Sequence, residues 1–236
     1  MMGLRIGMVL PSSNTVVEPV CMAMAMNLPA VSVHFSRFAL TAVSVDDPGA
    51  AYYDSGALLG AAKLLADARC HVICWNGSAG GVVGFARDRR LCAEIAAATG
   101  IPATTSSLAL IEQFRLTGVK RFVMVTLNPP DMNATIMRSF AAEGFDCAGA
   151  TQRSDIADNF AMSAVAPEDI SAMAQTCVQG CTSPPDALII YGTNTRGAQV
   201  ARSLQDRLGL PVYDSVTWGM LGALRAARFD ISTLLA

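Results

Sequence analysis

The sequence predicts an α/β protein with two similar Rossmann-like halves, each built on a parallel sheet, related by a pseudo-two-fold axis and facing each other across a ligand cleft. Three observations predict this fold. Short apolar runs alternate with longer amphipathic stretches along the whole chain. The runs are continuously apolar, as in parallel sheets that are buried on both faces. The chain also contains an internal repeat.

Runs rich in Val, Ile and Leu are predicted as strands, and the amphipathic stretches between them as helices. The predicted strands are Leu4–Leu10, Val31–Phe38, His71–Trp75, Arg121–Val125 and Ala187–Tyr191. The predicted helices are Ala57–Ala68, Phe85–Ala98, Met132–Glu143, Pro167–Gln179, Ala198–Leu208 and a last one at about 217–227. Thr15 with Glu18 three residues later is typical of a capping box, so another helix should begin there.

The internal repeat sets the predicted organisation. RIGMVLPSSN at 5–14 is similar to RFVMVTLNPP at 121–130, and HVICWNGSAGG at 71–81 is similar to ALIIYGTNTRG at 187–197. Both pairs are 116 residues apart (121 − 5 and 187 − 71). We therefore expect a first half at 1–112 and a second half at 113–216, with the C-terminal segment 217–236 packing back on the first half.

Composition excludes several classes of function. The 17 basic and 19 acidic side chains give a net charge of −2 without a basic block, so no nucleic-acid partner is expected. No apolar stretch is long enough to span a membrane and no signal peptide is evident, so a cytoplasmic location is expected. Seven scattered cysteines and two histidines form no recognisable metal site or Ser-His-Asp triad. No metal or cofactor is expected.

Polar turns follow four of the predicted strands, at the ends where parallel sheets bind ligands. Small residues in these turns let main-chain amides approach an anion, although each turn taken alone is also typical of an ordinary tight turn or helix cap. Hydroxyl groups that could take part in catalysis are those of Ser78, Tyr191 and Thr193, with Tyr191 as a weak general acid. The candidate substrate-binding residues in the turns are Ser12, Asn14, Asn76, Gly77, Asn128, Gly192 and Asn194. Arg37 and Arg196 could each contact a second carboxylate, or could form only surface salt bridges.

Three segments resemble the maleate cis-trans isomerase and arylmalonate decarboxylase group of the aspartate/glutamate racemase superfamily. They are PSSNTVVEP at 11–19, GTNTRG at 192–197 and LGLPVYDSVTWGMLGALRAA at 208–227, and the resemblance extends over essentially the full chain. It implies a small carboxylate bound between the halves, no cofactor, and a homo-oligomer.

The resemblance also shows where this chain departs from its group, whose chemistry uses one cysteine from each half. These two positions fall on Gly77 and Gly192, and a tyrosine that contacts the substrate corresponds to Asn128. Asn14 and Asn159 stand where the isomerases carry substrate-binding asparagines. The chain therefore keeps the frame of the group and lacks both catalytic cysteines.

Glycine is neither a base nor a nucleophile, so the usual thiol chemistry cannot operate here. Fixed hydrogen-bond donors favour a reaction that develops negative charge. We therefore expect a cofactor-independent lyase that acts on a small organic (di)carboxylic acid, by decarboxylation or elimination through an enediolate. The alternatives are a cis-trans isomerase or racemase that uses groups other than cysteine, and a non-catalytic carboxylate-binding protein.

Overall fold

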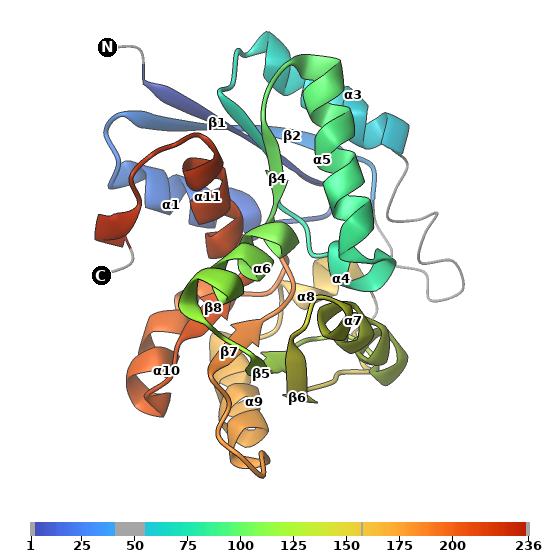
Figure 1. Ribbon diagram of the computed structural model, residues 1–236, viewed down its shortest axis with the longest axis vertical. Helices are drawn as coiled ribbons and strands as arrows, with labels where there is room; N and C mark the ends of the chain where they lie inside the picture. Colours follow the sequence, from blue (N-terminus) through green and yellow to red (C-terminus); the bar gives the residue numbers. More distant parts are fainter. Residues whose placement is uncertain (1–2, 41–54, 157, 235–236) are drawn as a thin grey trace.

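A computed structural model describes residues 3–40, 55–156 and 158–234 (Figure 1). In that part of the chain the strands form two four-stranded parallel sheets, with the orders β2-β1-β3-β4 and β6-β5-β7-β8. The two sheets have the same order of equivalent strands, and helices lie between them (Figure 1). The predicted α/β class is confirmed.

The elements alternate as the sequence pattern indicates. The first half contains β1 (Leu4–Pro11), α1 (Val17–Met26), β2 (Val31–Phe38), α3 (Ser55–Asp67), β3 (Val72–Trp75), α4 (Gly80–Val83), α5 (Phe85–Thr99), β4 (Ala103–Thr105) and α6 (Ser106–Thr117). The second contains β5 (Arg121–Val125), α7 (Pro130–Ala142), β6 (Asp146–Ala150), α8 (Asn159–Met162), α9 (Pro167–Gln179), β7 (Ala187–Ile190), the 3₁₀ turn Gly197–Gln199, α10 (Ala201–Leu208) and β8 (Val212–Asp214). The chain continues with α11 (Ser215–Ala226) and a 3₁₀ turn at Ser232–Leu234.

All five predicted strands are confirmed, each within one residue at either end. The predicted helix Ala198–Leu208 is divided, because a 3₁₀ turn precedes α10. Three strands, β4, β6 and β8, are not among those predicted from the apolar pattern. They lie at sheet edges and have three to five residues, so they carry too little apolar pattern to be recognised.

The predicted capping box at Thr15 is wrong. The N-cap residue of α1 is Val16, which makes no side-chain cap hydrogen bond. Instead, Asn14 Oδ1 accepts hydrogen bonds from the main-chain N–H groups of Val16 and Val17, at 3.0 and 2.9 Å. Glu18 does not reach back to the helix start, because its carboxylate pairs with Arg37 at 2.9 Å. An asparagine one position earlier thus takes the capping role.

The spacing of the second repeat segment also needs correction. The N–H of Asn76 donates to the carbonyl of Val9, and in the other half the N–H of Tyr191 donates to that of Val125. Val9 and Val125 are 116 residues apart (125 − 9), whereas Asn76 and Tyr191 are 115 apart (191 − 76). The expected spacing of 116 is therefore one too many for this segment. The structural equivalents are Gly77 and Gly192.

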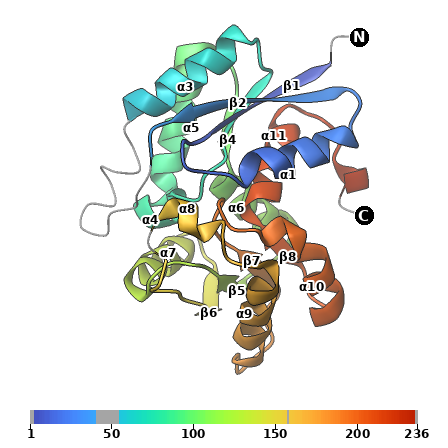
Figure 2. The ribbon, with the colours of Figure 1, turned by 180° about the vertical axis from the view of Figure 1, so that it is seen from behind.

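An aromatic core joins the two halves. The Phe114 ring of α6 contacts Phe122, Phe140 and Phe145, all from the second half. Helix α11 packs on α6, β3 and β4, beside the first sheet (Figures 1 and 2). The boundary that the sequence places between residues 112 and 113 lies inside α6. We propose that the halves divide at this helix, with α11 belonging to the first half.

Among the described residues, no helix combines the length and the apolar character needed to cross a bilayer.

Candidate functional site

A small cavity lies between the carboxyl ends of the two sheets. Its free volume is about 50 Å³. The turns that follow β3, β5 and β7 reach it, together with Pro11 at the end of β1. Its described lining residues are Pro11, Leu40, Trp75, Gly77, Ser78, Ala79, Val82, Leu127, Asn128, Met132, Ile136, Asn159, Met162, Tyr191, Gly192, Thr193, Asn194 and Thr195.

Eight of the eleven residues that the sequence nominates line this cavity. They are Gly77, Ser78, Asn128, Asn159, Tyr191, Gly192, Thr193 and Asn194. The other three lie outside its lining. Ser12 is exposed and bonds to Leu40 N–H, Asn14 caps α1, and the fully buried Asn76 donates to the carbonyl of Val216 under α11. These three side chains support the turns around the cavity.

The cavity wall combines polar and apolar residues, with no charged side chain among its described residues. Its apolar part includes Leu127, Met132, Ile136 and Met162 from the second half and Val82 of α4. Such a wall cannot hold a charged group but suits a hydrocarbon substituent. An anion in this cavity would be held by neutral hydrogen-bond donors alone.

Main-chain donors lie at equivalent places in the two halves. The N–H groups of Ser78, Ala79, Thr193 and Asn194 have no hydrogen-bond partner among the described residues, and all four residues line the cavity. The spacing is 115 for both pairs (193 − 78 and 194 − 79), as for the strands before them. Each half therefore offers two adjacent N–H groups, a pattern that suits a carboxylate.

The N–H groups of the two glycines themselves are not available. Gly77 N–H donates to the carbonyl of Trp75 at 2.9 Å, and Gly192 N–H donates to Ser215 Oγ at 3.2 Å. Each half holds its turn with a serine from the following helix start, since Ser106 Oγ donates to the Gly77 carbonyl at 2.7 Å. Of the main-chain N–H groups expected to bind an anion, at 77–79 and 192–194, those of the two glycines are therefore in use, and those of the next two residues of each turn remain.

The Tyr191 hydroxyl crosses from the second half into the turn of the first. It donates to the carbonyl of Ser78 at 2.8 Å and accepts from Gly81 N–H at 2.9 Å. Ser107 Oγ lies 2.9 Å away and, because the single phenolic proton is already used, must be the donor. The Tyr191 hydroxyl thus fixes the Ser78 turn, and its proton points at a carbonyl rather than at a ligand.

The hydroxyl groups of Ser78 and Thr193, unlike that of Tyr191, are not committed to hydrogen bonds with described residues. Neither hydroxyl has a hydrogen-bond partner among the described residues, and both residues line the cavity. The same holds for the side-chain amide of Asn128. These three groups remain able to contact a ligand.

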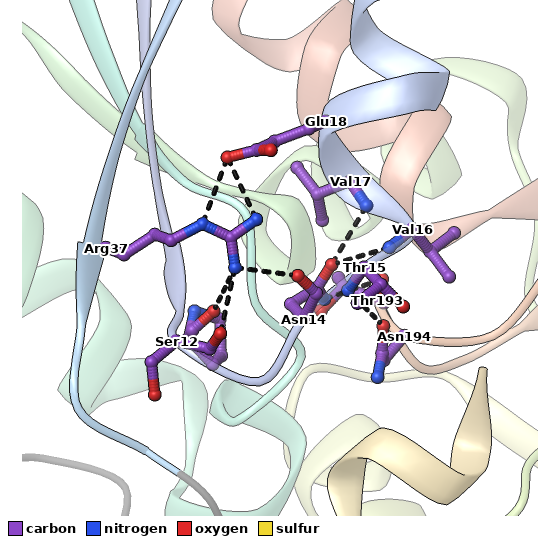
Figure 3. Close-up of polar contacts among 10 residues, drawn as sticks. Ser12, Asn14, Thr15, Val16, Val17, Glu18, Arg37, Thr193 and Asn194 are labelled. Atoms are coloured by element: carbon purple, nitrogen blue, oxygen red, sulfur yellow. Dashed lines mark hydrogen bonds and ion pairs between the residues drawn. The ribbon is translucent and has the colours of Figure 1, made fainter.

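Three asparagine side chains tie the halves together at the cavity edge, and two of them, Asn14 and Asn194, are drawn in Figure 3. Asn14 Nδ2 donates to the carbonyl of Thr193 at 3.0 Å, and Asn194 Oδ1 accepts from Thr15 N–H at 2.9 Å. Asn159 Nδ2 donates to Ser13 Oγ at 2.7 Å. These contacts hold the β1 turn against the β7 turn and against the start of α8.

Arg37 supports the same turn from outside (Figure 3). Its guanidinium pairs with Glu18 and donates to the carbonyls of Ser12 and Asn14 at 2.9 and 2.8 Å. Arg196 lines a different groove, beside α1. Neither arginine lines the cavity, so the structure does not place either near a second carboxylate there.

No cysteine is among the described residues that line the cavity. Cys74, the thiol closest in sequence to the first turn, is fully buried in β3 and contacts the carbonyl of Gly219. Burial raises its pKa well above the ordinary value, and burial raises the pKa of Cys21 to about 12. Thiols of this kind are inert structural groups. Within the described residues there is also no cluster that could hold a metal ion.

Trp75 and Thr195 are among the lining residues that the sequence analysis does not nominate. Both are 1% exposed, and within the described part of the chain neither Trp75 Nε1 nor Thr195 Oγ1 has a hydrogen-bond partner. A Cβ atom on Gly77 would lie 2.2 Å from Trp75 Cζ2, so the indole fills the space of a side chain there. The sequence does contain a signal for this contact. The large Trp75 side chain stands at the end of a strand, two residues before a glycine that has no side chain to compete with it for space.

Comparison with solved structures finds the same fold in a maleate cis-trans isomerase and in an arylmalonate decarboxylase. A maleate cis-trans isomerase from Nocardia farcinica bound to TRIS is 24% identical, with a TM-score of 0.87 over 97% of this chain and 94% of that one. A mutant of arylmalonate decarboxylase in its liganded form is 22% identical, with a TM-score of 0.82 over 95% and 92% of the two chains.

Comparison of sequences identifies the family among proteins with this fold. The curated arylmalonate decarboxylase from Bordetella bronchiseptica is 26% identical over 146 residues, which are 61% of this chain and 59% of the relative's length. A sequence model of the arylmalonate decarboxylase family matches residues 6–234. The predicted resemblance is confirmed, and the chain belongs to the arylmalonate decarboxylase family.

Proposed function

We propose that this protein is a cofactor-independent lyase that decarboxylates a small malonate-type dicarboxylic acid with an apolar substituent. The observation that carries the proposal is the set of four N–H groups, at Ser78, Ala79, Thr193 and Asn194, beside an apolar wall. The curated relative in this family is named for arylmalonate decarboxylation. The substituent would lie against Met132, Ile136 and their neighbours.

The chemistry follows from where charge develops. One carboxylate is held by the N–H groups while the bond between the other carboxyl carbon and the α-carbon breaks. The electron pair of that bond moves into the held carboxyl group and forms an enediolate, and carbon dioxide leaves. A proton from water or from a cavity hydroxyl such as Ser78 then adds to the α-carbon. Each preorganised donor can lower the barrier by about 3 kcal/mol, because the added negative charge appears beside it.

The positions and pKa values of the cysteines favour decarboxylation over isomerisation through a covalent cysteine adduct. A mutant of the Nocardia farcinica maleate cis-trans isomerase carries a covalently bound succinylcysteine intermediate. Here no cysteine is among the described lining residues, and the thiols of Cys21 and Cys74 have raised pKa values. An adduct of that kind has no nucleophile in this cavity.

The experiment follows α-methyl-α-phenylmalonate by proton NMR in deuterated buffer. The proposal expects conversion to 2-phenylpropanoate with one deuteron at the α-carbon. Maleate in a parallel sample tests the isomerase alternative by formation of fumarate. Binding of the malonate in calorimetry without any product after prolonged incubation would make the protein a carboxylate binder and contradict the proposed lyase.

A proline substitution can delete one main-chain donor. Ala79 has φ −60°, which proline adopts, and its N–H has no partner to lose. We expect Ala79→Pro to lower kcat about 100-fold. Ala166→Pro is the matched control, because Ala166 has φ −67°, precedes helix α9 and lies outside the cavity lining. Equal activity of the two variants would contradict the role of the Ala79 N–H.

A further inference from the structure

Two residues that line the cavity each carry a buried polar group without a hydrogen-bond partner among the described residues. Trp75 Nε1 and Thr195 Oγ1 lack hydrogen-bond partners among the described residues, and both side chains are 1% exposed and line the cavity. Buried donors of this kind are normally paired, since an unpaired one destabilises the folded state. Packing does not explain an unpaired polar group beside a ligand cavity, so such a group suggests a partner that binds in the cavity.

Both groups lie beside the two equivalent glycines. A Cβ atom on Gly77 would lie 2.3 Å from Trp75 Cε2, the ring carbon bonded to Nε1. A Cβ atom on Gly192 would lie 2.9 Å from Thr195 Oγ1, and the φ of +150° at Gly192 further disfavours a side chain. The glycines therefore leave room for the indole and for the hydroxyl.

We propose that Trp75 Nε1 and Thr195 Oγ1 bind oxygen atoms of a second oxygen-bearing group of the ligand and so select dicarboxylates over monocarboxylates. This inference rests on the proposed function. The indole N–H can only donate, so its partner is an acceptor such as a carboxylate oxygen. The hydroxyl of Thr195 donates to the same group. The four main-chain N–H groups remain for the carboxylate that becomes the enediolate.

Fluorescence can observe Trp75 directly, because the chain has two tryptophans. The other, Trp218, lies in α11 against Tyr213 and outside the cavity lining. In Trp218→Phe, Trp75 is the remaining tryptophan, and titration with phenylmalonate should shift its emission. In Trp75→Phe, where Trp218 remains, the same titration should leave the emission unchanged.

Affinity and stability together test Thr195. Thr195→Val keeps the shape of the side chain and removes the hydroxyl. We expect about tenfold weaker binding of phenylmalonate by calorimetry, unchanged binding of phenylacetate, and a higher Tm, because an unpaired buried hydroxyl is gone. Ser36→Ala is the matched control. Ser36 Oγ on β2 is also buried and has no hydrogen-bond partner among the described residues, but it lies outside the cavity lining, so Tm should rise without any change in affinity.

The outcomes separate the inference from the proposed function. If the unmodified protein binds phenylmalonate, but Trp75 emission and the affinity of Thr195→Val are both unchanged, the second subsite is wrong and the proposed function stands. If the unmodified protein binds neither phenylmalonate nor phenylacetate, both are overturned.

Discussion

Replacing Tyr191 by Phe tests whether this hydroxyl acts in structure or in proton transfer. The change removes the hydrogen bonds to the Ser78 carbonyl, Gly81 N–H and Ser107 Oγ, at 2.8, 2.9 and 2.9 Å, and keeps the ring contact with Phe140. At ~1 kcal/mol for each buried bond, the free energy of unfolding should fall by about 3 kcal/mol.

Urea unfolding followed by circular dichroism measures this change. Tyr213→Phe is the control, because the Tyr213 ring is also buried, at 7% exposed, and no hydrogen bond of its hydroxyl occurs among the described residues. The control should lose less than about 1 kcal/mol. If Tyr191→Phe proves as stable as the control, the hydroxyl does not hold the two halves together and our reading of it as a structural bridge fails.

The other predictions concern steric room and pH. Gly77→Cys should destabilise the protein by roughly 3 kcal/mol or more, because its Cβ would lie 2.2 Å from Trp75 Cζ2. Adding Trp75→Leu should recover part of that loss in a double-mutant cycle, and simple additivity of the two changes would show that no clash exists. Burial raises the pKa of Asp214 to about 6, so the folded state binds this proton more tightly than the unfolded state. The free energy of unfolding should therefore fall as pH rises from about 4 to about 6, by roughly 3 kcal/mol at most, and Asp214→Asn should flatten this dependence in urea titrations. An unchanged slope in Asp214→Asn would assign the effect to another group.

The sequence predicted those parts of the fold that rest on long apolar patterns. The strand Arg121–Val125 matches residue for residue, because its buried positions form a continuous apolar run. Val31–Phe38 also matches, although it is only partly buried, since apolar residues alternate with polar ones along its first half. Edge strands such as β4 were missed, since three residues with two threonines resemble a turn.

The candidate site was predicted only in part, because the sequence indicates which residues follow a strand but not which side chains meet in space. Turn residues such as Ser78 and Thr193 follow directly from strand ends, and the structure brings them to one cavity. The role of Asn14 as a cap depends on a one-residue shift of the helix start, and the indole of Trp75 reaches Gly77 only through its side-chain conformation. Contacts of this kind are tertiary, so no local pattern encodes them.

Amide NMR with phenylmalonate tests the central claim most directly. Our account predicts that the N–H resonances of Ser78, Ala79, Thr193 and Asn194 shift together and saturate at the same concentration, because one ligand contacts both halves. Shifts confined to the separate groove beside α1, where Val16, Val20 and Met24 line a cavity of about 700 Å³, would contradict it.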